Sequence, residues 1–101
     1  MASNDGQVVI YAVGDVGPRR IEYGEPIESL FDKVADKLKE ADIRLCQLER
    51  TFSDKGWLQY RSRPTTYKSR VHPDNVKSLV HAGFDLVTHA SNHCFDYGPE
   101  A

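Results

Sequence analysis

Three short apolar runs, each ending abruptly in polar residues, set the hydrophobic pattern of the chain. The runs cover residues 8–13, 43–48 and 84–88, and β-branched or other apolar side chains dominate each of them. Runs of this length and composition are typical of strands that are buried in a parallel sheet. We therefore predict three β-strands over these residues.

Amphipathic segments separate these runs. Over residues 28–41 the apolar positions recur at helical spacing with charged residues between them, which predicts a helix with one buried face. A second helix is predicted over residues 73–82, with Pro73 in its first turn and Gly83 as its C-terminal cap. Residues 50–72 between them are irregular and locally basic, and this long connection has room for a short hairpin.

The order strand, helix, strand, loop, helix, strand predicts an α/β fold with a parallel three-stranded βαβαβ sheet. Right-handed crossovers that wind in one direction put both helices on the same face of such a sheet. The strands are apolar on both sides, so the other face would expose a large apolar patch. We expect self-association or the remainder of the domain to cover that patch.

Each predicted strand is followed by side chains that can bind a metal ion or carry a proton. Asp15 and Glu49 follow the first two strands, and Asn92 and His93 follow the third. Ligands of open α/β sheets bind beyond the carboxyl ends of the strands, so we expect these residues at one edge. Two carboxylates, an amide oxygen and an imidazole suit Mn, Fe, Zn or Mg. On the residues alone, this metal site competes with the ordinary abundance of Asp, Asn and His at strand ends.

Composition narrows the class of protein. The chain has 101 residues, 40% of them hydrophobic and 28% charged, which indicates one globular domain. A net charge of -2 argues against a nucleic-acid or membrane-surface binder. No apolar run approaches the ~20 residues of a membrane span, and the first residues lack a signal-peptide pattern, so we expect a cytoplasmic protein. For Cys46 and Cys94, two reduced thiols are favoured and a disulfide stays open.

Several short motifs occur in an ordered series along the chain. They are V-G-D at 13–15, A-D-I at 41–43, Q-L-E at 47–49, A-G-F-D at 82–85 and A-S-N-H-C-F-D-Y-G at 90–98. In order and spacing they resemble the bacterial capsule-synthesis CapA family. That family is tied to poly-γ-glutamate capsules and belongs to the calcineurin-like metallophosphoesterase superfamily. The resemblance spans nearly the whole chain.

The resemblance implies that residues 1–101 are the N-terminal part of one α-β-β-α metallophosphoesterase-like sandwich. It implies a binuclear site for a divalent metal (Mn, Fe or Zn) with Asp15, Glu49 and Asn92 as ligands. His93 would be the catalytic histidine that contacts the scissile group, and Asp96 matches the pattern without an assigned role. The implied activity is hydrolysis of a phosphoester or related bond in capsule-polymer assembly, and members are often membrane-anchored or extracellular.

Three departures from the family pattern qualify this expectation. Q-L-E-R replaces N-L-E-G, S-N-H replaces N-N-H, and Gly17 stands where a D-x-H histidine ligand would be. Since further ligands would come from later strands, we expect negligible turnover from residues 1–101 alone. The alternative hypothesis is a non-catalytic CapA-like module that binds an anionic polymer or a protein partner through its basic loop. Arg61 and Arg63 are the predicted substrate-binding residues of that loop.

Overall fold

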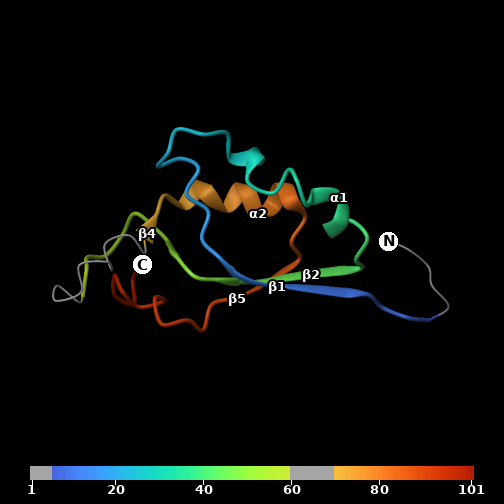
Figure 1. Cartoon of the computed structure of the whole chain (residues 1–101). Helices are drawn as coiled ribbons and strands as arrows, with labels where there is room; N and C mark the ends of the chain where they lie inside the picture. The colour runs from blue at the N-terminus through green and yellow to red at the C-terminus, as the bar shows by residue number, and fades with distance from the viewer. Residues whose placement is uncertain (1–5, 60–69) are drawn as a thin grey trace.

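A parallel three-stranded sheet forms the base of the molecule (Figure 1). The computed structural model describes residues 6–59 and 70–101. The strands are β1 (Ile10–Val16), β2 (Ile43–Leu48) and β5 (Leu86–Thr88), in the order β1-β2-β5. The predicted α/β class and the parallel sheet are therefore confirmed, and β2 is the central strand.

The strand β1 starts and ends later than the predicted run over residues 8–13, and it contains a bulge. Ala12 pairs with Leu45 and Asp15 pairs with Gln47, so β1 has one residue more than β2 between these pairs. Gly14 lies at this irregularity, as is common where a strand bulges. A bulge changes the alternation of side chains behind it, so it re-aims Asp15 at the carboxyl end of β1.

All helical segments of the described chain lie on one face of the sheet, above it in Figure 1. They are η1 (Ile27–Ser29), α1 (Ala35–Leu38), η3 (Pro73–Asn75) and α2 (Val76–Ala82). The second predicted helix is confirmed with both of its ends. Pro73 lies in the first turn, and Gly83 caps α2 in the left-handed conformation with φ 84°.

The first predicted helix, over residues 28–41, is wrong in extent. Only α1 is α-helical, and successive i→i+3 hydrogen bonds, such as that from Val34 N to Phe31 O (2.9 Å), replace the α-helix before it. A tertiary contact holds this segment in its observed conformation: Phe31 packs edge-to-face on Phe84, with ring centroids 5.3 Å apart. Contacts of this kind override a weak helix propensity.

Arg44 of β2 ties the sheet to both crossover segments. Its guanidinium donates hydrogen bonds to the carbonyl oxygens of Leu38, Ala41 and Gly83 at 2.7, 3.1 and 3.2 Å. It also lies 3.1 Å from the carboxylate of Asp85. Arg44 and, two residues on, the fully buried Cys46 therefore face the helices. Cys46 and Cys94 are both free thiols.

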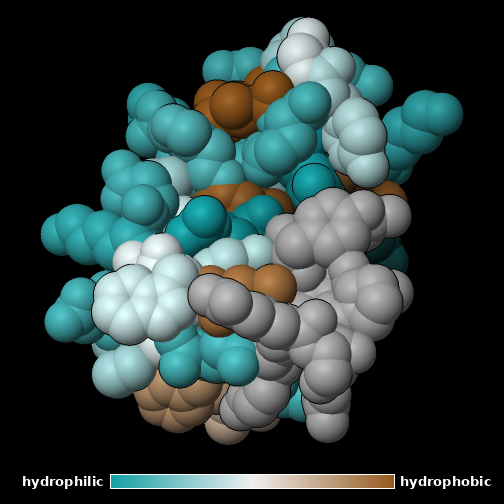
Figure 2. Space-filling view, turned by 90° about the vertical axis from the view of Figure 1, so that its left-hand side faces the viewer, coloured by the Kyte–Doolittle hydropathy of each residue, from teal (hydrophilic) through white to brown (hydrophobic). Residues whose placement is uncertain are grey.

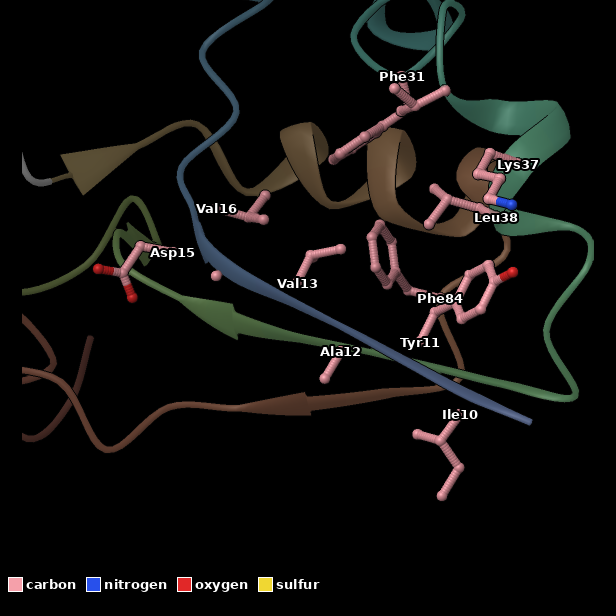
Figure 3. Close-up of a pocket in the computed structure, with 12 residues that line it drawn as sticks. Ile10, Tyr11, Ala12, Val13, Asp15, Val16, Phe31, Lys37, Leu38 and Phe84 are labelled. Atoms are coloured by element: carbon pink, nitrogen blue, oxygen red, sulfur yellow. The ribbon is translucent and has the colours of Figure 1, made fainter. Parts of the chain in front are cut away.

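The opposite face of the sheet is apolar and uncovered by the described residues, as predicted. Strand alternation and register place five side chains there, namely those of Ile10, Ala12, Ile43, Leu45 and Leu86. Ile10 is 57% exposed and Leu86 is 55% exposed. Figure 3 shows Ile10 and Ala12 pointing away from the helices.

A groove of about 660 Å³ runs along β1 on the helical side of the sheet. In Figure 3 the side chains of Tyr11, Val13 and Phe84 converge on it from below, and those of Phe31 and Leu38 close it from above. The groove is apolar for most of its length and reaches the carboxyl end of β1.

Two short strands, β3 (Thr51–Phe52) and β4 (Arg70–Val71), form a second small sheet. Thr51 pairs with Arg70 and Phe52 with Val71 in parallel orientation, so the two strands do not make the hairpin that residues 50–72 had room for. No helix within the described ranges is long and apolar enough to cross a membrane.

Candidate active site

The predicted site residues follow the carboxyl ends of the three parallel strands. Asp15 lies near the end of β1, and Glu49 follows β2 directly, with its backbone N–H bonded to Val16 O at 3.0 Å. A series of tight turns that contains Asn92 and His93 follows β5. This edge is the left-hand side of Figure 1, and Figure 2 shows that hydrophilic residues cover much of its described surface.

His93 and Glu49 are brought together by this arrangement. His93 Nε2 lies 3.5 Å from Glu49 Oε1, and both side chains are about three-quarters buried, at 27% and 26% exposure. The two residues are 44 positions apart in the sequence, since 93 − 49 = 44. Partial burial weakens screening by water, so a proton or cation between these atoms would interact strongly with both.

Asp96 fixes the other side of the His93 ring. Its Oδ2 lies 2.5 Å from His93 Nδ1, and its side chain is only 4% exposed. A carboxylate at this position accepts a hydrogen bond from Nδ1–H, which leaves Nε2 directed at Glu49. Sequence reasoning found no role for Asp96. The sequence feature that could have indicated its role is the His-x-x-Asp spacing before Gly98, whose φ of 89° marks a tight turn.

Neighbouring backbone contacts hold this turn in place. Thr51 of β3 is buried, and its hydroxyl donates to the carbonyl oxygen of His93 at 3.1 Å. Ser91 Oγ accepts from the backbone N–H of His93 at 3.3 Å, and Gln59 N–H donates to the carbonyl of Asp96 at 2.8 Å. The turn of His93 is therefore held from within by Ser91 and from outside by Thr51 and Gln59, which are distant from it in sequence.

Tyr97 packs behind the turn, against Arg70. The Arg70 guanidinium carbon lies 4.2 Å from the centroid of the Tyr97 ring, and the guanidinium donates to the carbonyls of Lys55 and Gly56 at 3.1 Å. Burial raises the pKa of the Tyr97 hydroxyl above its ordinary value, an effect that Arg70 partly opposes. Tyr97 therefore stays neutral near neutral pH and acts in packing.

The other predicted site residues are not brought into contact with this pair. Asp15 and Asn92 are exposed at the same edge of the sheet, and no hydrogen bond or ion pair to Glu49 or His93 is found for either within the described chain. Arg61 and Arg63 lie outside the described residues.

Gly17 and Arg50 are two of the departures from the family pattern, and the structure places them in contact. A Cβ atom built on Gly17 would lie 2.4 Å from Arg50 Cγ, which is far inside van der Waals contact. Arg50 thus fills the space that a histidine at position 17 would need. The arginine of Q-L-E-R and the glycine that replaces the D-x-H histidine therefore occur together because the arginine side chain packs over the glycine.

The donor chemistry of the edge fits a divalent cation, although the number of close donors is small. Carboxylate, amide and imidazole groups are hard or borderline donors that suit Mn, Fe or Zn. Within residues 6–59 and 70–101, however, no three Asp, Glu, His or Cys side chains cluster closely enough to hold a metal.

Comparison with known proteins identifies the family. The sequence model described as bacterial capsule synthesis protein PGA_cap matches residues 7–101, a stretch that includes the sheet, both crossover segments and the turn of His93. None of the curated proteins that we compared with the chain matches it. The family match agrees with the resemblance of the ordered motifs to CapA-like sequences. The chain therefore belongs to the bacterial capsule synthesis protein family PGA_cap.

Proposed function

We propose that this capsule-synthesis protein carries a metal-dependent phosphoester hydrolase site that serves the assembly of a poly-γ-glutamate capsule. The observation that carries the proposal is the orientation of His93, whose ring is held between Asp96 at Nδ1 and Glu49 near Nε2. A histidine that is fixed on one side by a buried carboxylate and open on the other suits proton transfer.

In this proposal each residue of the site has a separate role in proton transfer. Asp96 holds the imidazole ring through its contact with Nδ1, and His93 donates the proton at Nε2 to the leaving-group oxygen. Before substrate binds, the Glu49 carboxylate is the acceptor that lies 3.5 Å from Nε2. Thr51 limits movement of the turn because its hydroxyl binds the His93 carbonyl.

Asp15, Glu49 and Asn92 would hold the metal ion. When bound, a divalent cation supplies Lewis-acid polarisation of the phosphoryl group. Glu49 would then have two roles, as a ligand of the ion and as the carboxylate that lies 3.5 Å from His93 Nε2. The small number of close donors means that residues 1–101 alone should turn over substrate negligibly, so binding is the appropriate measurement.

The first test is a calorimetric titration of Mn²⁺ into the protein. We expect binding that weakens at least tenfold in Asp15→Ala and in Glu49→Ala, since each variant removes an anionic ligand. Asp36→Ala is the matched control, because Asp36 is fully exposed on α1 and its ion pair is with the exposed Lys39, 3.6 Å away.

His93→Ala separates the metal from the proton-transfer group. If His93 acts on the leaving group, its removal should leave Mn²⁺ binding within about threefold of wild type. Mn²⁺ binding that survives in both Asp15→Ala and Glu49→Ala would contradict the proposal. The non-catalytic reading would then be favoured, provided that polyglutamate binding also survives these changes but is lost in the Arg61→Ala, Arg63→Ala double variant.

A further inference from the structure

The apolar groove along β1 ends beside the candidate site. Its walls are apolar side chains, and Figure 3 shows Val13 and Phe84 facing into it. Asp15 and Val16 line its end, and the carbonyl oxygen of Val16 accepts a hydrogen bond from the backbone N–H of Glu49 at 3.0 Å. The groove therefore leads to two of the residues that would hold the metal ion.

A second hollow continues the groove around the end of β1. It has a volume of about 230 Å³, shares Asp15, Val16 and Phe31 with the groove, and extends to Gly17 and Leu30. The apolar path is thus continuous with the edge of the sheet where open α/β folds bind their ligands. A molecule that is bound at this edge has room to extend back along β1.

The dimensions of the groove indicate what kind of molecule fits. The seven residues of β1 span about 23 Å, so a volume of 660 Å³ corresponds to a mean cross-section of about 29 Å², or about 6 Å across. An α-helix with its side chains is about 10–12 Å wide and does not enter such a groove. A hydrocarbon chain does, since carbon atoms pack at separations of about 4 Å.

The polarity of the groove favours the same occupant. An extended peptide would bury an N–H and a C=O group at each residue against apolar walls, and unpaired groups of this kind are costly. Lys37 lines the far end beside Tyr11, but its ammonium group lies 2.7 Å from the carboxylate of Glu40, so this end has little net charge. A chain without polar groups is favoured here, because its apolar surface leaves water.

We infer that the groove binds the hydrocarbon chain of an amphiphilic phosphoester, with the phosphate at the carboxyl end of β1 and the chain running back toward Tyr11. The groove binds and positions the substrate and takes no part in bond cleavage. This inference rests on the proposed function, since it names the substrate class of that same site as the phosphoesters of long-chain alcohols.

The test is a calorimetric titration of the whole chain with butyl, octyl and dodecyl phosphate, each below its critical micelle concentration, with and without Mn²⁺. We expect the affinity to rise about three- to fourfold for each added methylene until the groove is full, because each methylene leaves water on binding. An affinity that does not depend on chain length would overturn the inference.

Two valine substitutions provide a matched pair. Val34 lines the groove and is 49% exposed, whereas Val76, 43% exposed at the start of α2, lies outside the described lining of the groove. Val34→Ser should weaken dodecyl phosphate binding about threefold or more, because the wall loses apolar surface, and Val76→Ser should leave it unchanged. Circular dichroism checks that both variants are folded.

A third variant narrows the groove without making it polar. Val13→Phe keeps a residue that suits a strand and places a larger side chain where Figure 3 shows Val13 facing into the groove. The affinity should then stop rising at a shorter chain than in the wild type. Dodecyl phosphate binding that is unchanged in Val13→Phe would contradict the inferred course of the chain.

Intermolecular NOEs report the direction of the bound chain, with Zn²⁺ in place of the paramagnetic Mn²⁺. The terminal methyl group of dodecyl phosphate should show NOEs to the Tyr11 ring, and the methylene next to the phosphate should show NOEs to the Val16 methyl groups. The reverse pattern would place the phosphate away from the candidate site and would overturn the inference.

The remaining outcomes separate this inference from the proposed function. Equal effects of Val34→Ser and Val76→Ser would reject the groove as the hydrocarbon site, while Mn²⁺ binding through Asp15 and Glu49 could stand. If Val34→Ser instead shifts the sedimentation-velocity distribution toward monomer and leaves dodecyl phosphate binding unchanged, the groove joins copies of the chain and the inference is wrong. Chain-length-dependent binding through Val34 without any dependence of Mn²⁺ binding on Asp15 and Glu49 would keep the hydrocarbon site and reject the metal-dependent hydrolase.

Discussion

At the scale of single residues, the candidate site is centred on His93, and only some of the neighbours of this histidine could be predicted from the sequence. Its position after the third strand was predictable, because an apolar run ends there in polar groups. The 2.5 Å contact between His93 and Asp96 was not, because it depends on the tight turn that brings the two side chains together. The 3.5 Å approach of Glu49 followed from the parallel register of β2 and β5.

Asp96→Asn tests how much this orientation depends on the carboxylate. The variant keeps the shape of the side chain but buries an amide N–H₂ group without a matching acceptor, so we expect the free energy of unfolding to fall by about 1–3 kcal/mol. In wild type, ¹H–¹⁵N NMR of the ring should show His93 protonated at Nδ1, and Asp96→Asn should shift the population toward the other tautomer.

The matched control is Asp54→Asn, which makes the same chemical change at an exposed position. It should alter neither the urea midpoint nor the NMR signals of the His93 ring. A His93 ring that keeps its Nδ1 proton in Asp96→Asn would show that Thr51, Ser91 and the turn suffice to orient it.

At the scale of elements, Arg44 is the residue on which the two crossover segments depend. It joins the end of α1, the start of β2 and the cap of α2 through three carbonyl groups. The sequence indicated none of this, because an arginine within a strand reads as a solvent-facing residue. Its partners are backbone atoms that become neighbours only when both segments fold onto the same face.

Arg44→Ala should therefore destabilise the protein by about 2–4 kcal/mol, because several part-buried carbonyl groups lose their donor at once. Urea unfolding followed by circular dichroism measures the change. Lys39→Ala, which removes only an exposed pair with Asp36, should stay within about 0.5 kcal/mol of wild type. Equal effects of the two substitutions would contradict the role of Arg44.

The elements also show which sequence signals were sufficient. The strands could be predicted because an apolar run bounded by polar residues is a local feature of the sequence. The helix α2 could be predicted because the backbone geometry of Pro73 and Gly83 marks its two ends. The segment over 28–41 was misjudged because its charges and apolar spacing fit a helix, whereas packing of Phe31 on Phe84 favours tighter turns. The β3–β4 pair depends on contacts across the chain that no local pattern reports.

At the scale of the whole molecule, the sheet has one covered and one uncovered face. The helical layer buries Cys46 and Leu38 completely or nearly so, while Ile10 and Leu86 on the far face stay more than half exposed. Exposed apolar surface of this kind marks an interaction face.

We predict that the isolated chain associates through this far face as its concentration rises. Leu86→Thr should shift the sedimentation-velocity distribution toward monomer, because it removes an apolar side chain and keeps a strand-compatible residue. Val80→Thr is the control, because Val80 is 72% exposed on α2, away from this face. A wild-type chain that stays monomeric at high concentration would contradict the prediction.

The parallel pairing of β3 with β4 has an evolutionary consequence. Phe52 pairs with Val71, so the two ends of the sequence between these strands are held close together. The entropy of closing a loop grows only with the logarithm of its length, about 0.6 kcal/mol for each doubling. Insertions after Gln59, whose N–H binds the Asp96 carbonyl, can therefore be tried by natural selection at small cost, while Thr51 keeps its hydrogen bond to His93. Homologues can in this way diversify what they recognise without rebuilding the chemistry beside it.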